Sequence, residues 1–301
     1  MSPYLLGIFS AFVEPVLHAW ANILDSYLSN KLFQRLIPLI FASSLVGIIL
    51  IPFVVFFASP LSIPMRFAGI LFLIALIEVL YLYPYYCALR CADTSVVASL
   101  FSLGKVFVPA LAFLFLGEHL TIVQYAGFFI LTASSVFLAL DIRKMRFNRA
   151  FVLMLGVSIL LAIQSVLLKY VYEHGVGWGS SIIWMSAFQF LIAVALVLIF
   201  SSRVELKRTA NTIRSYLPLF LLMELLTWGG TLAGSFAIYL IPISIAKGIA
   251  STQPMFVLLY AFLFAQVSPD VFREYLGRGE VIKKALLFLS AVLGVLFIKG
   301  V

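Results

Sequence analysis

Six ionisable side chains stand inside long apolar stretches of the sequence, where a charge must be paired, solvated or used. They are Glu14, His18, Glu78, Lys105, Glu224 and Lys247. In a bilayer each would cost about 3 kcal/mol even on the mildest scale, so each is expected to line a solvated cavity or to join an ion pair that locks helices together. Lysines suit a carboxylate or phosphate, and glutamates suit an amino group or a proton. The set therefore predicts a binding site for a zwitterion or a polar anion.

Four further side chains are expected to join this substrate-binding set. Tyr81, Tyr85 and Trp228 can supply stacking walls or cation-π faces, although belt or core positions are an equal alternative for aromatic residues. Gln253 precedes Pro254, and a proline inside a helical pattern frees backbone carbonyls that can line a site. We expect no catalytic residue, metal or cofactor.

The first apolar stretch places its polar residues on one face. Glu14, His18 and Asn22 recur at helical spacing, and Asp25 follows close to the same stripe. Such a stripe cannot face lipid, and Pro15 favours a helix that bends around a site.

The composition places the whole chain in a bilayer. Hydrophobic residues make up 64% and charged residues 11% of the 301 positions, and the mean hydropathy is +1.16. A membrane-spanning helix needs about 20 apolar residues. Ten segments are predicted to span, near 3–24, 36–58, 66–87, 94–116, 122–140, 150–171, 180–200, 216–240, 243–267 and 282–299.

One stretch occurs twice, at a constant offset of 149 residues. Residues 101–118 read FSLGKVFVPALAFLFLGE and residues 250–267 read ASTQPMFVLLYAFLFAQV, so that Ser102 matches Ser251. A gap-free offset of half the chain indicates duplication. Five helices per repeat is an odd number, so the second repeat, 142–301, should be inverted relative to the first, 1–141. In this register Lys105 and Lys247 should point toward the same centre. The predicted fold is an all-α integral membrane protein with a 5+5 inverted repeat.

These motifs resemble the drug/metabolite transporter superfamily, EamA type, over essentially the whole chain. The resemblance is carried by Ala88-Leu89-Arg90, the run from Ser95 to Leu103, Leu116-Gly117-Glu118, the opening from Gln124 to Gly127, and the weaker copy from Ala237 to Pro254. It implies a ten-helix carrier with a central cavity that works by alternating access. Family members commonly have a proline where Lys105 stands, whereas Pro254 keeps it in the second repeat. The lysine indicates specialisation toward an anionic group.

The net charge of +8 comes from basic residues that flank the membrane segments, so a nucleic-acid partner is not expected. Fifteen of them fall in the odd-numbered links, in three groups near 143–149, 203–214 and 273–284 and at Lys31, Arg35 and Arg90. The even links and termini hold Arg66, Lys169 and Lys299. This bias predicts termini outside the cytoplasm, whereas the resemblance implies termini inside it.

The sequence thus predicts a secondary active transporter of a small polar metabolite in the cell membrane, working with protons or by exchange against a counter-substrate. The zwitterion, such as an amino acid, and the anion both stay open. A lipid or hydrophobic drug flippase or exporter on the same fold is the alternative. An enzyme is not expected, because no paired metal carboxylates, HExxH or Gly-x-Ser-x-Gly motif is embedded in the chain.

Overall fold

The computed structural model describes residues 2–33, 35–56, 62–91, 94–139 and 149–265, with 286–287, 289–290 and 293–297 near the C-terminus. Half of the predicted tenth helix, 282–299, lies outside the described residues. The predicted boundary between residues 141 and 142 and the link 268–284 also lie outside them.

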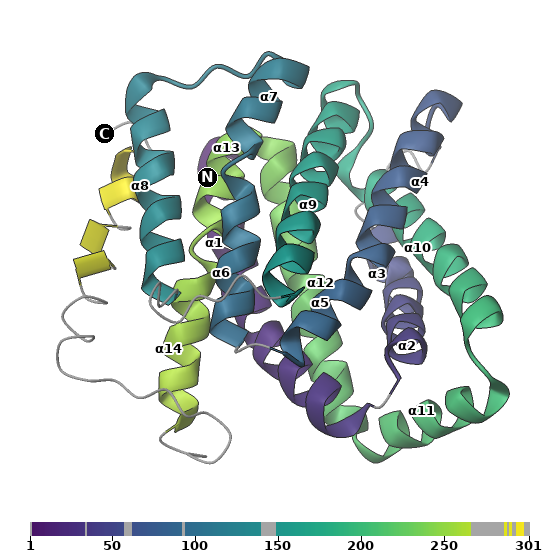
Figure 1. The fold of residues 1–301 in the computed structure, drawn as a ribbon. Coiled ribbons are helices and arrows are strands. Elements are labelled where there is room, and N and C mark those ends of the chain that lie inside the picture. Colours follow the sequence, from purple (N-terminus) through teal and green to yellow (C-terminus); the bar gives the residue numbers. More distant parts are fainter. Residues whose placement is uncertain are drawn as a thin grey trace.

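The described chain is a bundle of helices, without a strand in these ranges (Figure 1). In chain order the elements are α1 (Pro3–Tyr27), the π-helix η1 (Leu28–Leu32), α2 (Leu36–Ile49), α3 (Ile51–Val55), α4 (Met65–Leu80), α5 (Leu82–Leu89), α6 (Thr94–Lys105), α7 (Val108–Leu116), α8 (Ile122–Ala139), α9 (Arg149–Glu173), α10 (Trp178–Phe200), α11 (Arg203–Ser215), α12 (Leu217–Leu240), α13 (Ile243–Ala250) and α14 (Gln253–Ala265).

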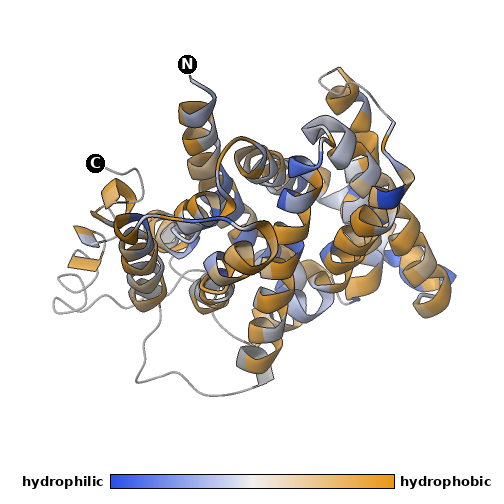
Figure 2. Ribbon diagram, turned by 90° about the horizontal axis from the view of Figure 1, so that it is seen from above, coloured by the Kyte–Doolittle hydropathy of each residue, from blue (hydrophilic) through white to orange (hydrophobic). Residues whose placement is uncertain are grey.

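Seven of the described helical stretches are long and apolar enough to cross a membrane. They are α1 with η1, α2 with α3, α4 with α5, α6 with α7, α9, α10 and α12. Hydrophobic residues cover most of the helical ribbon (Figure 2). The fold is therefore that of an all-α, multi-pass membrane protein, as the composition predicts. Two more predicted segments, 122–140 and 243–267, are helical in their described parts, as α8 and as α13 with α14.

Four segments that the sequence predicts as single helices are each broken in two. The breaks fall at Leu50, at Tyr81, at 106–107 and at 251–252. Each second piece carries a proline within its first turn, namely Pro52, Pro84, Pro109 and Pro254. Proline fits the first turn of a helix but removes one backbone donor and clashes with the preceding turn, so the chain restarts there.

The broken helices α6–α7 and α13–α14 occupy equivalent places in the sequence. Both segments are interrupted shortly before a proline, at 106–107 before Pro109 and at 251–252 before Pro254, so the two interruptions are 145 positions apart. Their packing partners correspond as well. Helix α1 packs against α12, α13 and α14, whereas α9 packs against α4, α5, α6 and α7, and α2 and α10 pack against each other.

Helix α11 lies in a stretch that the sequence predicts only as a basic link. The helix is amphipathic and begins with a capping box in which Ser202 and Glu205 exchange side-chain and backbone hydrogen bonds. Its Glu205 also pairs with Arg35 before α2, with 3.0 Å between Oε1 and Nε. This helix is too polar to be predicted as a membrane-spanning segment. In the sequence it is indicated only by the 3.6-residue spacing of its apolar residues over 13 positions.

Candidate functional site

A central cavity of about 250 Å³ gathers all ten candidate residues onto one lining. Helix α1 contributes Glu14 and His18, the α4–α5 pair contributes Glu78, Tyr81 and Tyr85, and α12 contributes Glu224 and Trp228. The broken helices contribute Lys105, Lys247 and Gln253. The predicted convergence of the two lysines is thus observed, whereas the role of these residues in binding stays a prediction.

Glu14 and Lys247 form an ion pair across the cavity wall. Lys247 Nζ lies 2.8 Å from Glu14 Oε1, and both side chains are largely buried. The second oxygen of Glu14 has no hydrogen-bond partner within the described ranges. This oxygen, Oε2 of Glu14, can accept a hydrogen bond from a ligand or can bind a proton.

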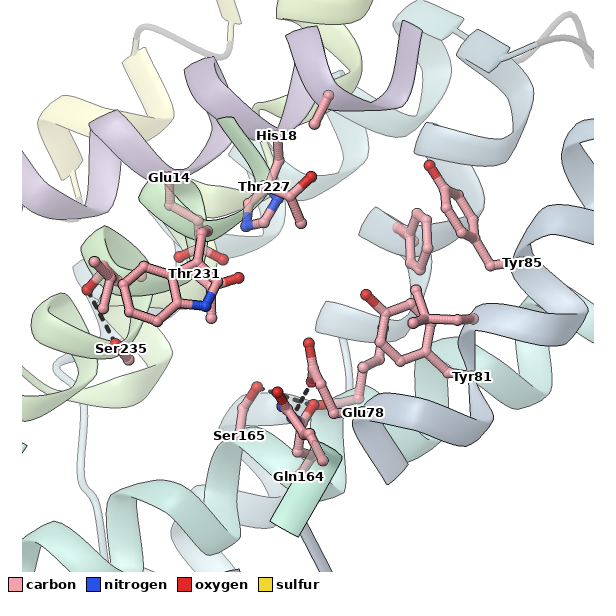
Figure 3. A pocket seen from close by; sticks show the side chains of 18 of the residues that line it. Glu14, His18, Glu78, Tyr81, Tyr85, Gln164, Ser165, Thr227, Thr231 and Ser235 are labelled. Carbon is pink, nitrogen blue, oxygen red and sulfur yellow. Dashed lines mark hydrogen bonds between the residues drawn. The ribbon is translucent and has the colours of Figure 1, made fainter. Parts of the chain in front are cut away.

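Two glycines on α12 make room for the polar stripe of α1. A Cβ atom on Gly230 would stand 2.8 Å from the His18 ring, and one on Gly234 would overlap the Glu14 carboxylate. The two glycines and the two polar residues both have four-residue spacing, so the small surface of one helix faces the polar stripe of the other. Figure 3 shows Glu14 and His18 beside Thr227, Thr231 and Ser235 of α12.

Lys105 lies where the fourth predicted span breaks, at the end of α6. Its ammonium donates to the carbonyl oxygen of Ala250, the last residue of α13, at 2.7 Å. The carbonyls at a helix C-terminus lack helical partners and carry partial negative charge, so they attract a cation. The break in α13–α14 therefore supplies the free carbonyl that the prolines of this segment predict.

Glu78 faces the α1 stripe from the opposite side of the cavity (Figure 3). Gln164 of α9 donates to its carboxylate through Nε2, and Ser165 lies beside them. Gln164 is absent from the predicted site. Its signal is an amide inside an apolar helix, which is a weaker indication of a site than an ionisable group.

Asp25 closes the polar stripe of α1 with two tyrosine partners. Tyr85 and Tyr86 place their hydroxyls 3.0 and 3.2 Å from its carboxylate oxygens. The ring of Tyr85 also contacts Tyr81 and Phe101, with centroid distances of 6.3 and 5.2 Å. Asp25 lines the cavity but is absent from the predicted site, and the stripe on α1 is the signal that could have added it.

Glu224 lies on α12 next to Ser43 and is only 5% exposed. Its Oε1 atom has no hydrogen-bond partner in the described part of the chain. Burying a carboxylate oxygen without a donor is costly, so we expect the neighbouring Ser43 hydroxyl, a proton or a bound donor to satisfy it.

Two charged side chains outside the central cavity, Lys169 and Glu118, form hydrogen bonds with the backbone where α12 ends and α13 begins. Lys169 of α9 donates to the carbonyls of Ile238 and Ile241, at 3.0 and 3.1 Å. Glu118 accepts from the backbone N–H groups of Ile243 and Ser244, at 2.8 and 3.0 Å. The assignment of Lys169 to a link is wrong, because this residue lies buried within α9. Its long apolar stem lets the ammonium reach the helix end.

A second cavity, of about 240 Å³, lies between α4, α7 and α9 and shares no lining residue with the central one. Its lining residues are Ile70, Leu111, Phe115, Ile163, Val166, Leu167 and Tyr170. No charged side chain lines it. It is an apolar groove without a means of recognising a polar group.

Within the described residues, no group of three or more His, Cys, Asp and Glu side chains is arranged to hold a metal ion.

Comparison with known proteins supports the fold. No family model matches the chain, and no curated protein matches it in sequence. Twenty-eight solved chains are similar in structure. One of them, described only as "Crystal structure of protein", has a TM-score of 0.66 at 14% identity, over 99% of this chain and 98% of that one. The chain therefore shares its overall fold with a solved protein of nearly the same extent.

Proposed function

We propose that the protein is a secondary active transporter of a small polar metabolite, working by alternating access. The observation that carries the proposal is the convergence of Glu14, Glu78, Glu224, Lys105 and Lys247 on one central cavity. Ion pairs that merely lock helices together would pair each charge with another. Here Glu14–Lys247 is the one such pair among these five in the described structure. Charges kept at membrane depth without an ion-pair partner indicate a pathway for polar solutes.

The architecture that we propose for this transporter is ten helices in two inverted repeats. The interruption of both α6–α7 and α13–α14 before a proline and the corresponding packing of α1 and α9 support it. Broken helices whose free ends line a site near the repeat interface are typical of secondary transporters. We also propose membership of the EamA-type drug/metabolite transporters, on the order and spacing of the sequence motifs. Neither an enzymatic activity nor a cofactor is part of the proposal.

The test is solute flux across the membrane of liposomes that contain the purified full-length protein. We expect uptake of labelled amino acids or small organic acids, with a rate that depends on a proton gradient or on internal counter-substrate. Replacement of Lys105 or Lys247 by Met should abolish this flux. The matched control is Lys207→Met, which removes an exposed lysine on α11. Equal transport by both cavity variants and the wild type would contradict the proposed binding role.

A lipid or hydrophobic drug flippase is the second candidate. The apolar groove between α4, α7 and α9 favours it, because an acyl chain fits a groove lined by aliphatic and aromatic side chains. The same liposomes distinguish the two functions. Movement of a labelled lipid between leaflets, unaffected by Lys105→Met and Lys247→Met, would support the flippase.

A further inference from the structure

The charges of the central cavity are unevenly neutralised. Four carboxylates line it, namely Glu14, Asp25, Glu78 and Glu224, against two lysines and His18. Lys247 is paired with Glu14, and Lys105 is bound to a helix carbonyl. The remaining three carboxylates have no ion pair in the described structure. The cavity thus offers more unpaired acidic groups than unpaired basic ones.

Asp25 accepts hydrogen bonds from Tyr85 and Tyr86, and Glu224 lines the same cavity as these tyrosines. Tyr81, Tyr85 and Phe101 contact one another through their rings, with centroid distances of 5.2 to 6.3 Å, and all three line the cavity. The faces of aromatic rings attract cations, most strongly where water is excluded. A set of rings beside buried carboxylates is the arrangement that recognises an ammonium group.

We propose that Asp25, Glu224 and the rings of Tyr81, Tyr85 and Phe101 form a subsite for a cationic amine of the substrate, distinct from the Glu14–Lys247 pair. Glu224 has an unpartnered oxygen for a substrate N–H donor, and Asp25 is oriented by its two tyrosines. The inference rests on the proposed transport function and narrows its substrate class. The carried metabolite then bears an amine, as a zwitterion does, and is not a simple anion.

The other charged and titratable groups near the subsite are consistent with this assignment. Glu78 lines the same cavity with Gln164 as its donor, and the hydroxyl of Tyr86 points at Asp25. Neither group brings a positive charge. Lys105 lies at the broken end of α13 on the lining of the same cavity, where it can meet a carboxylate on the same substrate.

The test uses three small probes that share a phenyl ring and differ in charge. Phenethylamine carries the amine alone, 3-phenylpropanoate carries the carboxylate alone, and phenylalanine carries both. Binding to the purified full-length protein is measured by calorimetry and by the shift in melting temperature. We expect phenylalanine and phenethylamine to bind at least about tenfold more tightly than 3-phenylpropanoate, the difference of one charge-assisted contact.

Variants then locate the subsite. Asp25→Asn and Glu224→Gln should weaken phenethylamine about tenfold and leave 3-phenylpropanoate unchanged, and Phe101→Leu should weaken the amine probes through the lost ring. Glu205→Gln, on α11, is the matched control. If Asp25→Asn does not fold, Glu224→Gln and Phe101→Leu still decide the question.

Preference for 3-phenylpropanoate, or failure of both amines to bind, would overturn the subsite. Equal binding of the amines to wild type and to the Glu224→Gln variant would also overturn it, because the carboxylates would then hold only protons. The liposome flux assay does not depend on these binding measurements. Failure of the subsite proposal can therefore be told apart from failure of the proposed transport function.

Discussion

The hydroxyl of Ser102 donates a hydrogen bond of 3.1 Å to the carbonyl oxygen of Ser251, the residue that follows it by 149 positions. This separation is the offset of the repeat that the sequence predicts. Residues related by a two-fold axis can touch their own counterparts only next to that axis. The contact therefore places the middle of α6 and the end of α13 where an axis between two repeats would pass.

Close packing of α6 on α9 should be sensitive to one added methyl group. A Cβ atom on Gly104 would collide with the backbone of Ser158, which cannot rotate away as a side chain can. We expect Gly104→Ala to destabilise the protein by about 1–3 kcal/mol, the usual cost of overpacking. Thermal unfolding in detergent measures this. Gly156→Ala is the control, because nothing lies within 4 Å of its added Cβ; an equal melting temperature for both variants would contradict the packing.

Gly234→Ala should damage the site more than the fold. The added methyl group would meet the Glu14 carboxylate, which is the end of a flexible side chain and can shift away from Lys247. We expect flux to fall about tenfold, equivalent to about 1.4 kcal/mol, with a small change in melting temperature. Gly69→Ala, in open space on α4, serves as the control. Unchanged flux in Gly234→Ala would show that transport does not depend on the geometry of the Glu14–Lys247 ion pair.

The Glu14–Lys247 pair predicts a non-additive double mutant. Glu14→Gln or Lys247→Met alone leaves a buried charge without its partner, which typically costs about 3–5 kcal/mol. The double variant removes both charges. It should therefore unfold at a higher temperature than the less stable of the two single variants. Additive losses across the cycle would show that the two groups do not interact in the folded protein.

Glu118 should act as the N-terminal cap of α13. Its two oxygens accept from two backbone N–H groups that have no helical partner. Glu118→Ala should cost about 1–2 kcal/mol of stability, as loss of a helix cap does, and Glu118→Gln should cost less because one acceptor remains. The order of the three melting temperatures tests this. A Gln variant as unstable as the Ala variant would instead point to the charge, through the facing Lys169.

The start of α11 should contribute stability that depends on pH. The pKa of Glu205 lies below its ordinary value of 4.5, first because the backbone N–H of Ser202 donates to its carboxylate and then because Arg35 lies nearby. When the pKa of a carboxyl group is lower in the folded state than in the unfolded state, the group stabilises the folded protein at pH values above its unfolded-state pKa. This contribution is lost as the pH falls through the folded-state pKa. We expect the difference in melting temperature between wild type and Glu205→Gln to be present at pH 7 and to be lost progressively as the pH falls below 4.5.

Helical periodicity and charge are sufficient to predict much of the cavity lining from the sequence. The four-residue spacing of Glu14 and His18 places both on one face of α1, because helix geometry fixes that relation. The breaks are visible in the sequence only through their prolines, since the register of a restart depends on tertiary contacts such as Lys105 with Ala250. Asp25 is absent from the predicted site although the polar stripe of α1 indicates it. Gln164 is absent because its relevance comes from a partner on another helix, Glu78. No local pattern records such pairings.

The contacts that cross between the two halves of the sequence have a consequence for the motion of the molecule. Lys105 holds Ala250, Gln164 holds Glu78, and Lys247 holds Glu14, so each bond joins a residue from one half to a residue from the other. If one half rocks against the other, these bonds break or exchange together, because an intermediate would strand several buried polar groups at once. We expect these bonds to switch together between two stable conformations of the protein, so that each switch moves one solute across.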